Sequence, residues 1–394
     1  MNGTIYMPVG EVCSSISDTY REKKNMVTLI NTSDVLEGRV LNHERVPNSN
    51  LKGQFKKTFQ RDDILYSEIR PQNRRFAYVD FSPIDYIAST KLMVIRAKKD
   101  VVSPKYLYYF LKNSSTVAEL QLLAETRSGT FPQITFSEVA NLTIPVPSLA
   151  VQEVIVQTMQ CLEDKITCNE QINDNLEQQA QAIYHERFET VSPNDLPYDW
   201  RIVTLGEVVT ISNKSFNPLK EPEILLEHYS IPAFDEARFP VFELSTSIKS
   251  NKFIIDASCF MISKLNPTTK RVWKPYCLTE DAVCSTEFIV YKAKDQAITD
   301  FLYSVIDSGS FSDFMCSHVT GSTGSRQRTT PAETLSYKLI LPSENELAEF
   351  QSLVSPMYAQ MRINAIENDK LKRLRDSLLP KLMSGEIDVS AVQL

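Results

Sequence analysis

The chain has 394 residues, of which 42% are hydrophobic and 23% are charged, and its formal net charge is −7. This composition is typical of a globular protein with two or three domains, and it excludes a fibrous or mainly disordered chain. No apolar run approaches the roughly 20 residues that span a bilayer. The N-terminus also lacks a basic region followed by an apolar one, so we expect a cytoplasmic protein with no membrane partner.

Charge is distributed unevenly along the chain. Residues 50–147 contain 14 Lys and Arg against 9 Asp and Glu, whereas residues 148–199 contain 2 against 10. The acidity is therefore concentrated in one segment, and the basic segment before it can attract phosphates. The seven cysteines are odd in number and none forms a C-x-x-C motif, so we expect reduced structural thiols and no metal site.

The first 147 residues predict a mixed α/β domain. Residues 11–20 predict a short helix, and residues 26–40 predict a strand with a turn that Gly38 permits. Residues 63–71 predict a strand that leaves its sheet at Pro71 and precedes the basic loop QNRR. A further strand is expected at 92–95 and a helix from residue 106. Its aromatic residues are expected in the core rather than as stacking platforms for bases; they are Tyr106, Tyr108, Tyr109 and Phe110.

The same order of segments recurs after the linker VSPNDLPYDW. The predicted strand at 260–267 matches the first domain at an offset of 196, which places Ser263 on Ser67 and Pro267 on Pro71. Its loop TTKR falls where QNRR did. A period near 195 residues is too long for a solenoid repeat and indicates duplicated domains with pseudo-twofold symmetry.

Each domain is followed by a segment with the 3.5-residue period of a coiled-coil seam. The first seam runs from Ile155 to Ile183, and the second, from Phe350 to Leu378, repeats it 195 residues later. Pro356 and Pro380 are expected to interrupt the second helix. Both seams contain two asparagines, which cost stability and fix the register; they are Asn169 and Asn173, and Asn364 and Asn368.

These patterns predict an α+β protein with two mixed α/β domains in a pseudo-twofold tandem repeat, separated by two long antiparallel coiled-coil helices. Duplex DNA has a twofold axis of the same kind, and a helix of about 40 residues, roughly 60 Å long, is enough to hold two domains one DNA turn, ~34 Å, apart. We expect the first domain at 1–147, the first helix at 148–190, the second domain at 191–342 and the second helix at 343–394.

The chain resembles the specificity subunit of type I restriction-modification enzymes. The likeness rests on DILYSEIRPQNRR, on SGTFPQIT before IPVPSLAVQE, on GSTGSRQR and on the ending LKRLRDSLLPKLMSGEI. It covers nearly the whole length, and the order of the elements is more specific than any one motif. One departure is the shorter LPSE at 341–344, where the first half has IPVPSL.

This resemblance implies two target-recognition domains that read the two halves of a split site in double-stranded DNA. It further implies that the helices dock two methyltransferase subunits, which join translocase-nuclease subunits. S-adenosylmethionine then belongs to the methyltransferase, and ATP and magnesium to the translocase, so no cofactor is expected in this chain.

A search for catalytic motifs agrees with a non-catalytic subunit. The chain has no G-x-x-x-x-G-K-[ST], no G-x-G-x-x-G and no N-P-P-[FY] or D-P-P-[FYW] box. Its four histidines lie far apart in the sequence and have no motif partner. We therefore expect no catalytic residue and no metal ligand.

Candidate DNA contacts lie in basic or hydroxyl-rich loops at matching places. In the major groove arginine suits guanine and asparagine or glutamine suits adenine, while lysine and threonine serve phosphates equally well. One set comprises Arg70, Gln72, Asn73, Arg74 and Arg75, and Thr268, Thr269, Lys270, Arg271 and Lys274. A second set comprises Ser128, Thr130 and Gln133, and Ser325, Arg326, Gln327 and Arg328. For every residue the competing interpretation is a solvated loop side chain.

The leading hypothesis is a DNA-reading subunit without catalysis. One alternative is a decayed or repurposed coiled-coil scaffold that no longer reads sequence, and uniform affinity for all DNA sequences favours it. A second alternative is a self-sufficient nuclease, because the many Asp and Glu residues scattered along the chain could resemble a nuclease site. That alternative requires cleavage by the purified chain with magnesium alone.

Overall fold

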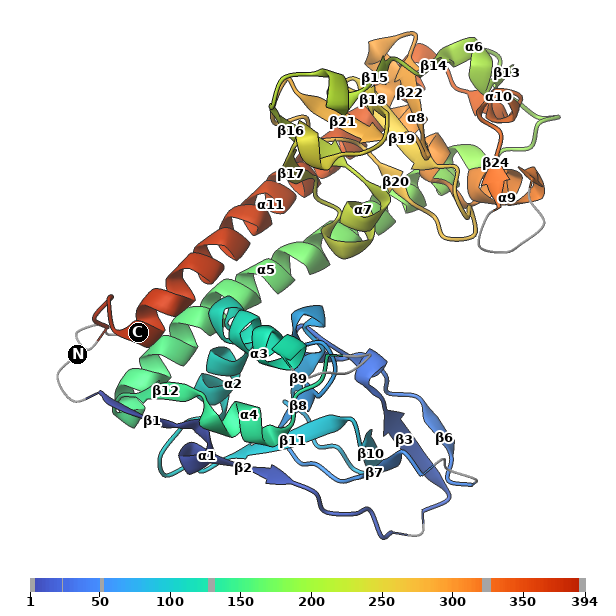
Figure 1. The fold of residues 1–394 in the computed structure, drawn as a ribbon. Helices are drawn as coiled ribbons and strands as arrows, with labels where there is room; N and C mark the ends of the chain where they lie inside the picture. The colour runs from blue at the N-terminus through green and yellow to red at the C-terminus, as the bar shows by residue number, and fades with distance from the viewer. Residues whose placement is uncertain (1–3, 23, 50–52, 127–131, 321–326, 390–394) are drawn as a thin grey trace. The chain divides into compact units, whose positions relative to one another are not determined.

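The computed structural model describes residues 4–22, 24–49, 53–126, 132–320 and 327–389. The chain divides into two compact units. Unit 1 comprises residues 1–165 and 370–394, and unit 2 comprises residues 166–369. Each unit combines small sheets and short helices with part of two long helices, drawn in green and red in Figure 1.

Unit 1 contains an antiparallel sheet and a mixed sheet. The antiparallel sheet has the order β2 (Cys13–Ile16), β11 (Leu92–Ala97), β8 (Ile64–Ser67), β9 (Phe76–Tyr78). The mixed sheet has the order β6 (Arg45–Pro47), β3 (Met26–Ile30), β10 (Tyr86–Ser89), β7 (Phe55–Lys57). Two smaller pairs join β1 (Ile5–Pro8) to β12 (Thr143–Val146) and β4 (Val35–Leu36) to β5 (Arg39–Val40). The helices are α1 (Val9–Val12), α2 (Pro104–Lys112), α3 (Ser114–Thr126) and α4 (Phe136–Asn141), with 3-10 turns η1 (Thr32–Asp34) and η2 (Pro71–Asn73).

Unit 2 repeats this order with additions. Its antiparallel sheet has the order β14 (Val209–Ser212), β22 (Phe288–Ala293), β19 (Cys259–Ser263), β20 (Val272–Trp273). Its mixed sheet is larger, in the order β15 (Ser215–Phe216), β18 (Lys252–Ile254), β21 (Ala282–Ser285), β16 (Leu225–Tyr229), β17 (Val241–Leu244). Smaller pairs join β13 (Arg201–Thr204) to β25 (Lys338–Leu341) and β23 (Val319–Thr320) to β24 (Arg328–Thr329). The helices are α6 (Leu205–Val208), α7 (Ile231–Ala237), α8 (Thr299–Asp307), α9 (Gly309–Ser317) and α10 (Pro331–Thr334), with 3-10 turns η4 (Pro218–Lys220), η5 (Ser245–Ser247) and η6 (Gln296–Ile298).

The antiparallel sheet of each unit is buried on both faces. Successive side chains of a strand point to opposite faces. In β11, Met93 and Ile95 therefore join the core that contains α2, while Leu92 and Val94 join a second cluster on the other face. This double burial explains the apolar run from Leu92 to Ile95. The predicted core aromatics of α2 are all buried.

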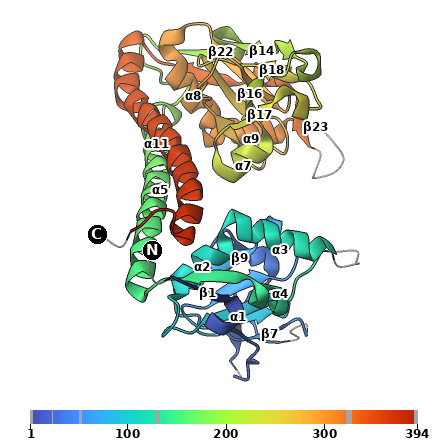
Figure 2. The same ribbon diagram turned by 60° about the vertical axis from the view of Figure 1, so that its left-hand side comes forward.

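The two long helices are α5 (Leu149–Tyr184), which continues into the π-helical turn η3 (His185–Glu189), and α11 (Glu344–Ser384). Figure 2 shows them side by side. In unit 1, Ile155 and Met159 of α5 share a core with Leu379 and Leu382 of α11. In unit 2, rising residue numbers in α5 meet falling numbers in α11. The helices are therefore antiparallel. Together with the repeated sheets, this confirms the predicted α+β fold.

Two expectations from the sequence were wrong. The segment 11–20 is helical only at its start, because from Cys13 to Ile16 its backbone pairs with β11 as strand β2. Helix α11 also continues through Pro356 and Pro380. Its buried neighbours Val354 and Leu379 pack into the cores, and this burial outweighs the loss of one backbone hydrogen bond at each proline. In the described part of the chain, no helix is long and apolar enough to cross a membrane.

Candidate nucleic-acid interface

The first candidate loop of each unit begins with the same left-handed turn. Arg70 follows β8 with φ of 45°, and Asn266 follows β19 with φ of 48°. The hydroxyl of Ser67 accepts the backbone N–H of Ile69 at 3.1 Å, and Ser263 does the same for Leu265 at 3.1 Å. Such serine turns are a local way to satisfy the backbone where a strand ends.

This turn brings the two predicted sets of loop residues together in each unit. The N–H of Arg70 donates to the carbonyl of Pro132 at 3.1 Å, and the N–H of Asn266 donates to the carbonyl of Gln327 at 2.9 Å. Isolated bridges pair Ile69 with Gln133, and Leu265 with Arg328. The segments before α4 and α10 therefore lie against the strand-end turns.

In unit 1 the loop arginines contact their own domain. Arg74 donates to the hydroxyl of Ser114 at 2.9 Å, and its Nε lies 3.8 Å from Glu37. Arg75 donates to the carbonyl of Ser33 at 3.0 Å. Both arginines are half-buried, whereas the remaining members of the set are exposed; these are Arg70, Gln72 and Asn73.

In unit 2 the basic side chains of the loop are paired with carboxylates. Lys270 forms an ion pair with the buried Asp307 at 2.8 Å. Arg271 donates to both oxygens of Asp235, at 2.6 and 2.8 Å, and Lys274 pairs with Asp300. The positive charge of this loop is thus largely neutralised within the unit, while Thr268 and Thr269 are exposed.

The second set is only partly described. Ser128, Thr130, Ser325 and Arg326 lie outside the described residues. Gln133 is half-buried, and its Oε1 accepts a hydrogen bond from Lys91 at 3.2 Å. Arg328 donates to both oxygens of Glu287, at 3.0 and 3.1 Å.

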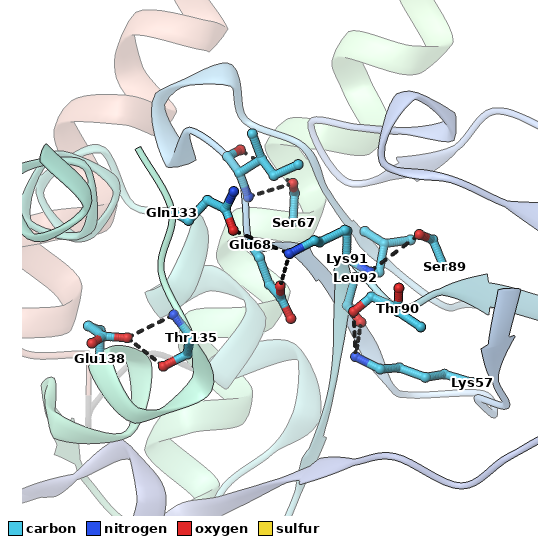
Figure 3. Close-up of polar contacts among 11 residues, drawn as sticks. Lys57, Ser67, Glu68, Ser89, Thr90, Lys91, Leu92, Gln133, Thr135 and Glu138 are labelled. Atoms are coloured by element: carbon cyan, nitrogen blue, oxygen red, sulfur yellow. Dashed lines mark hydrogen bonds and ion pairs between the residues drawn. The ribbon is translucent and has the colours of Figure 1, made fainter. Parts of the chain in front are cut away.

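Sequence reasoning missed the charged residues that hold this second set. Lys91 lies 3.5 Å from Glu68, and Figure 3 shows its ammonium between Glu68 and Gln133. Lys57 donates to the carbonyls of Thr90 and Leu92, at 3.0 and 2.8 Å, and so supports the turn that carries Lys91. Burial lowers the pKa of Lys57. The signal that could have revealed these residues is the repeat itself, because Glu68 and Lys91 recur 196 residues later as Lys264 and Glu287.

The four seam asparagines form two pairs in unit 2. Asn169 donates to Asn368 at 2.8 Å, and Asn368 donates to the carbonyl of Ile166 at 3.2 Å. Asn364 donates to Asn173 at 2.8 Å, and Asn173 donates to the carbonyl of Met361 at 3.2 Å. These bonds satisfy polar groups that would otherwise be buried without partners. Within the ranges that the structure describes, no cluster of His, Cys, Asp or Glu is arranged to hold a metal ion.

Residues 6–178 match the family model described as the type I restriction modification DNA specificity domain. The resemblance to type I specificity subunits is thereby confirmed.

Individual relatives extend this similarity to nearly the whole chain. The chain is 28% identical to the type I restriction enzyme HindI specificity subunit of Haemophilus influenzae, over 92% of this chain and 94% of that protein. It is 25% identical to the MjaIX specificity subunit of Methanocaldococcus jannaschii, over 78% of this chain and 76% of that protein. The crystal structure of the type I restriction-modification S subunit from M. genitalium is similar with a TM-score of 0.54 at 14% identity, over 97% of this chain and 96% of that one. At this identity the structural likeness shows the fold alone.

Proposed function

We propose that this chain is the non-catalytic specificity subunit of a type I restriction-modification complex and reads a bipartite target in double-stranded DNA. The observation that carries the proposal is the convergence, in both units, of a strand-end turn with a second polar segment. Paired loops on a rigid sheet are a common way to present side chains to base edges. In this proposal residues 1–147 and 191–342 are the two target-recognition domains, and residues 148–190 and 343–394 are the spacer helices.

We further infer the partners from the family. Two methyltransferase subunits dock on the spacer helices, and translocase-nuclease subunits join that core. S-adenosylmethionine, ATP and magnesium then act in those partners, and this chain needs no cofactor of its own. Such a complex acts on chromosomal DNA, and we therefore infer a cytoplasmic location.

The scaffold alternative is favoured by one observation. Each basic side chain in the TTKR loop and the following Lys274 has a carboxylate partner in unit 2. DNA must compete with Asp307, Asp235 and Asp300 for these side chains. If the competition fails, unit 2 contributes to assembly but not to sequence reading.

Mapping methylated bases in cells that carry this chain and its methyltransferase tests the proposal. We expect modification at a two-part sequence with an unread spacer of constant length. Cells with the methyltransferase alone are the control and should lack that pattern. A pattern with only one specified half would show that unit 2 does not read DNA, and sequence-independent binding of the complex would favour the scaffold.

A further inference from the structure

A group of three polar residues recurs beside the strand-end turn of each unit, with its charges inverted. In unit 1 the group is Glu68, Lys91 and Gln133, and in unit 2 it is Lys264, Glu287 and Arg328. The first two positions are separated by 196 residues from their counterparts and the third by 195. We call each group a reading triad.

The backbone of the two triads is the same. The N–H of Glu68 donates to the carbonyl of Lys91 at 3.0 Å, and the N–H of Lys264 donates to the carbonyl of Glu287 at 2.9 Å. Each third residue is bridged to the residue that follows the first position, Gln133 to Ile69 and Arg328 to Leu265. The third side chain therefore starts from an equivalent place in both units.

The charges of the side chains differ between the units, but the carboxylate is the less exposed partner of the ion pair in both. In unit 1 the Lys91 side chain is 49% exposed and its partner Glu68 is 20% exposed. In unit 2 the Arg328 side chain is 42% exposed and its partner Glu287 is 28% exposed. In both units a carboxylate lies behind a more exposed cation. The cation that contacts the carboxylate is at the second position in unit 1 and at the third position in unit 2.

We propose that Lys91, held by Glu68, positions Gln133 and that Glu287 positions Arg328. In this proposal Gln133 and Arg328 contribute to the choice of base in their half-sites. This inference rests on the proposed function. Glu287 binds the Nε side of Arg328 and fixes its plane; a guanidinium held in this way can donate from its terminal nitrogens to O6 and N7 of guanine. Lys91 orients the Gln133 amide through its oxygen, and an amide is suited to adenine. The two half-sites then differ at this position, guanine against adenine.

Methylation mapping with single variants tests the third positions. Arg328→Gln should reduce modification of sites with the preferred guanine by roughly 10- to 100-fold at one position of one half-site. Gln133→Ala should do the same for an adenine in the other half-site. Lys98→Gln and Lys294→Gln are matched controls, because these lysines are also 196 residues apart and each donates to a backbone carbonyl, of Glu11 and Gly206, at 2.8 Å. Neither control should change the pattern.

Two further variants separate positioning from mere stability. Glu287→Gln keeps the shape of the side chain that holds Arg328 but removes its charge. It should therefore weaken the guanine preference less than Arg328→Gln, and the preference at the other positions of the target should not change. A purely structural role would lower the unfolding temperature and leave the base preference intact. The triple change Glu68→Lys, Lys91→Glu and Gln133→Arg transplants the second triad into unit 1 and should introduce a guanine preference in the first half-site.

Three outcomes overturn the inference. An active Arg328→Gln complex with an unchanged pattern removes Arg328 from base choice. An even loss over all sequences makes Arg328 a phosphate contact. An inactive Arg328→Gln complex that no longer unfolds cooperatively assigns the residue to the fold. If the unmodified complex itself shows no two-part pattern, the proposed function fails instead, so the two failures are distinguishable.

Discussion

Lys112 in unit 1 and Asp307 in unit 2 occupy equivalent positions, 195 residues apart, at the ends of α2 and α8. Both side chains are largely buried where a domain packs on α5. Lys112 pairs with Glu163 of α5, whereas Asp307 accepts a hydrogen bond from Gln181 of α5 at 2.9 Å and pairs with Lys270. The contact between domain and long helix therefore contains a buried cation in unit 1 and a buried anion in unit 2.

A second difference lies beside these residues, between α2 and α5 in unit 1 and between α8 and α11 in unit 2. Glu163 also accepts a hydrogen bond from Tyr109 at 2.9 Å, and 195 residues later Tyr358 bonds to Ser304 at 2.7 Å. A charged pair in unit 1 is thus a neutral pair in unit 2. A buried charge without a partner costs several kcal/mol, so each inverted charge is compatible with the fold only because its own unit compensates it. The two units share their backbone fold. Their polar contacts differ, and residues that contact one another differ together.

The largest expected effect comes from breaking the ion pair between Lys112 and Glu163 in unit 1. Glu163→Gln should destabilise the chain by about 3 kcal/mol, because it leaves the Lys112 ammonium buried without a counter-charge. Tyr358→Phe is the matched change in unit 2 and should cost about 1 kcal/mol, since it removes one neutral hydrogen bond. Denaturant unfolding of both variants measures the difference. Equal losses of unfolding free energy would show that the charged contact of unit 1 and the neutral contact of unit 2 contribute equally to stability.

The loop residues provide the next comparison. Arg74→Ala in unit 1 and Lys270→Ala in unit 2 should each weaken one half-site only, by about 1–3 kcal/mol for a residue that contacts a base. Lys270→Ala should also lower stability, because the buried Asp307 loses its cation. Arg74→Ala should lower it less, since it removes one hydrogen bond of a half-buried side chain. Methylation mapping and thermal unfolding of the same variants separate the effects. A loss spread evenly over both half-sites would identify phosphate contacts.

The helix pairs of the two units differ in polarity. Unit 1 buries apolar seam residues such as Ile155 and Met159, while the helix pair of unit 2 contains both asparagine pairs. Asn368→Leu alone should cost roughly 1–2 kcal/mol, because Asn169 loses a buried partner. Changing Asn169 and Asn368 together to Leu should raise the unfolding temperature but relax the register. Unfolding and size-exclusion measurements check this, and a double variant less stable than the single one would contradict it.

The last comparison concerns pH. Burial raises the pKa of Asp307 to about 6, partly offset by Lys270. Because the folded state then holds the proton more tightly than the unfolded state, the contribution of Asp307 to stability falls as pH rises from about 4 to 6, on the order of 1 kcal/mol per pH unit. The stability difference between Asp307→Asn and the unchanged chain should therefore grow in favour of Asn over this window. A flat difference would mean that Lys270 keeps Asp307 ionised throughout.

Features that depend on sequence period were predictable. The seam of the long helices follows from a 3.5-residue repeat, and the duplication follows from matches such as Ser67 with Ser263. The burial of Tyr106 and its neighbours followed from their position on a helix. In these cases neighbouring residues carry the information, because helix and strand geometry set which side chains share a face.

Other features needed the tertiary structure. Helix α11 passes through two prolines because its packing compensates for them, and Cys13 to Ile16 form a strand because β11 is there to pair with. The pairing of Lys270 with Asp307 joins residues 37 positions apart, and that of Asn169 with Asn368 joins residues 199 apart. The sequence by itself determined the repeat, the helices and the positions of the polar loops. The tertiary structure decided which charges compensate one another, because an ion pair depends on distances that only the packed chain sets.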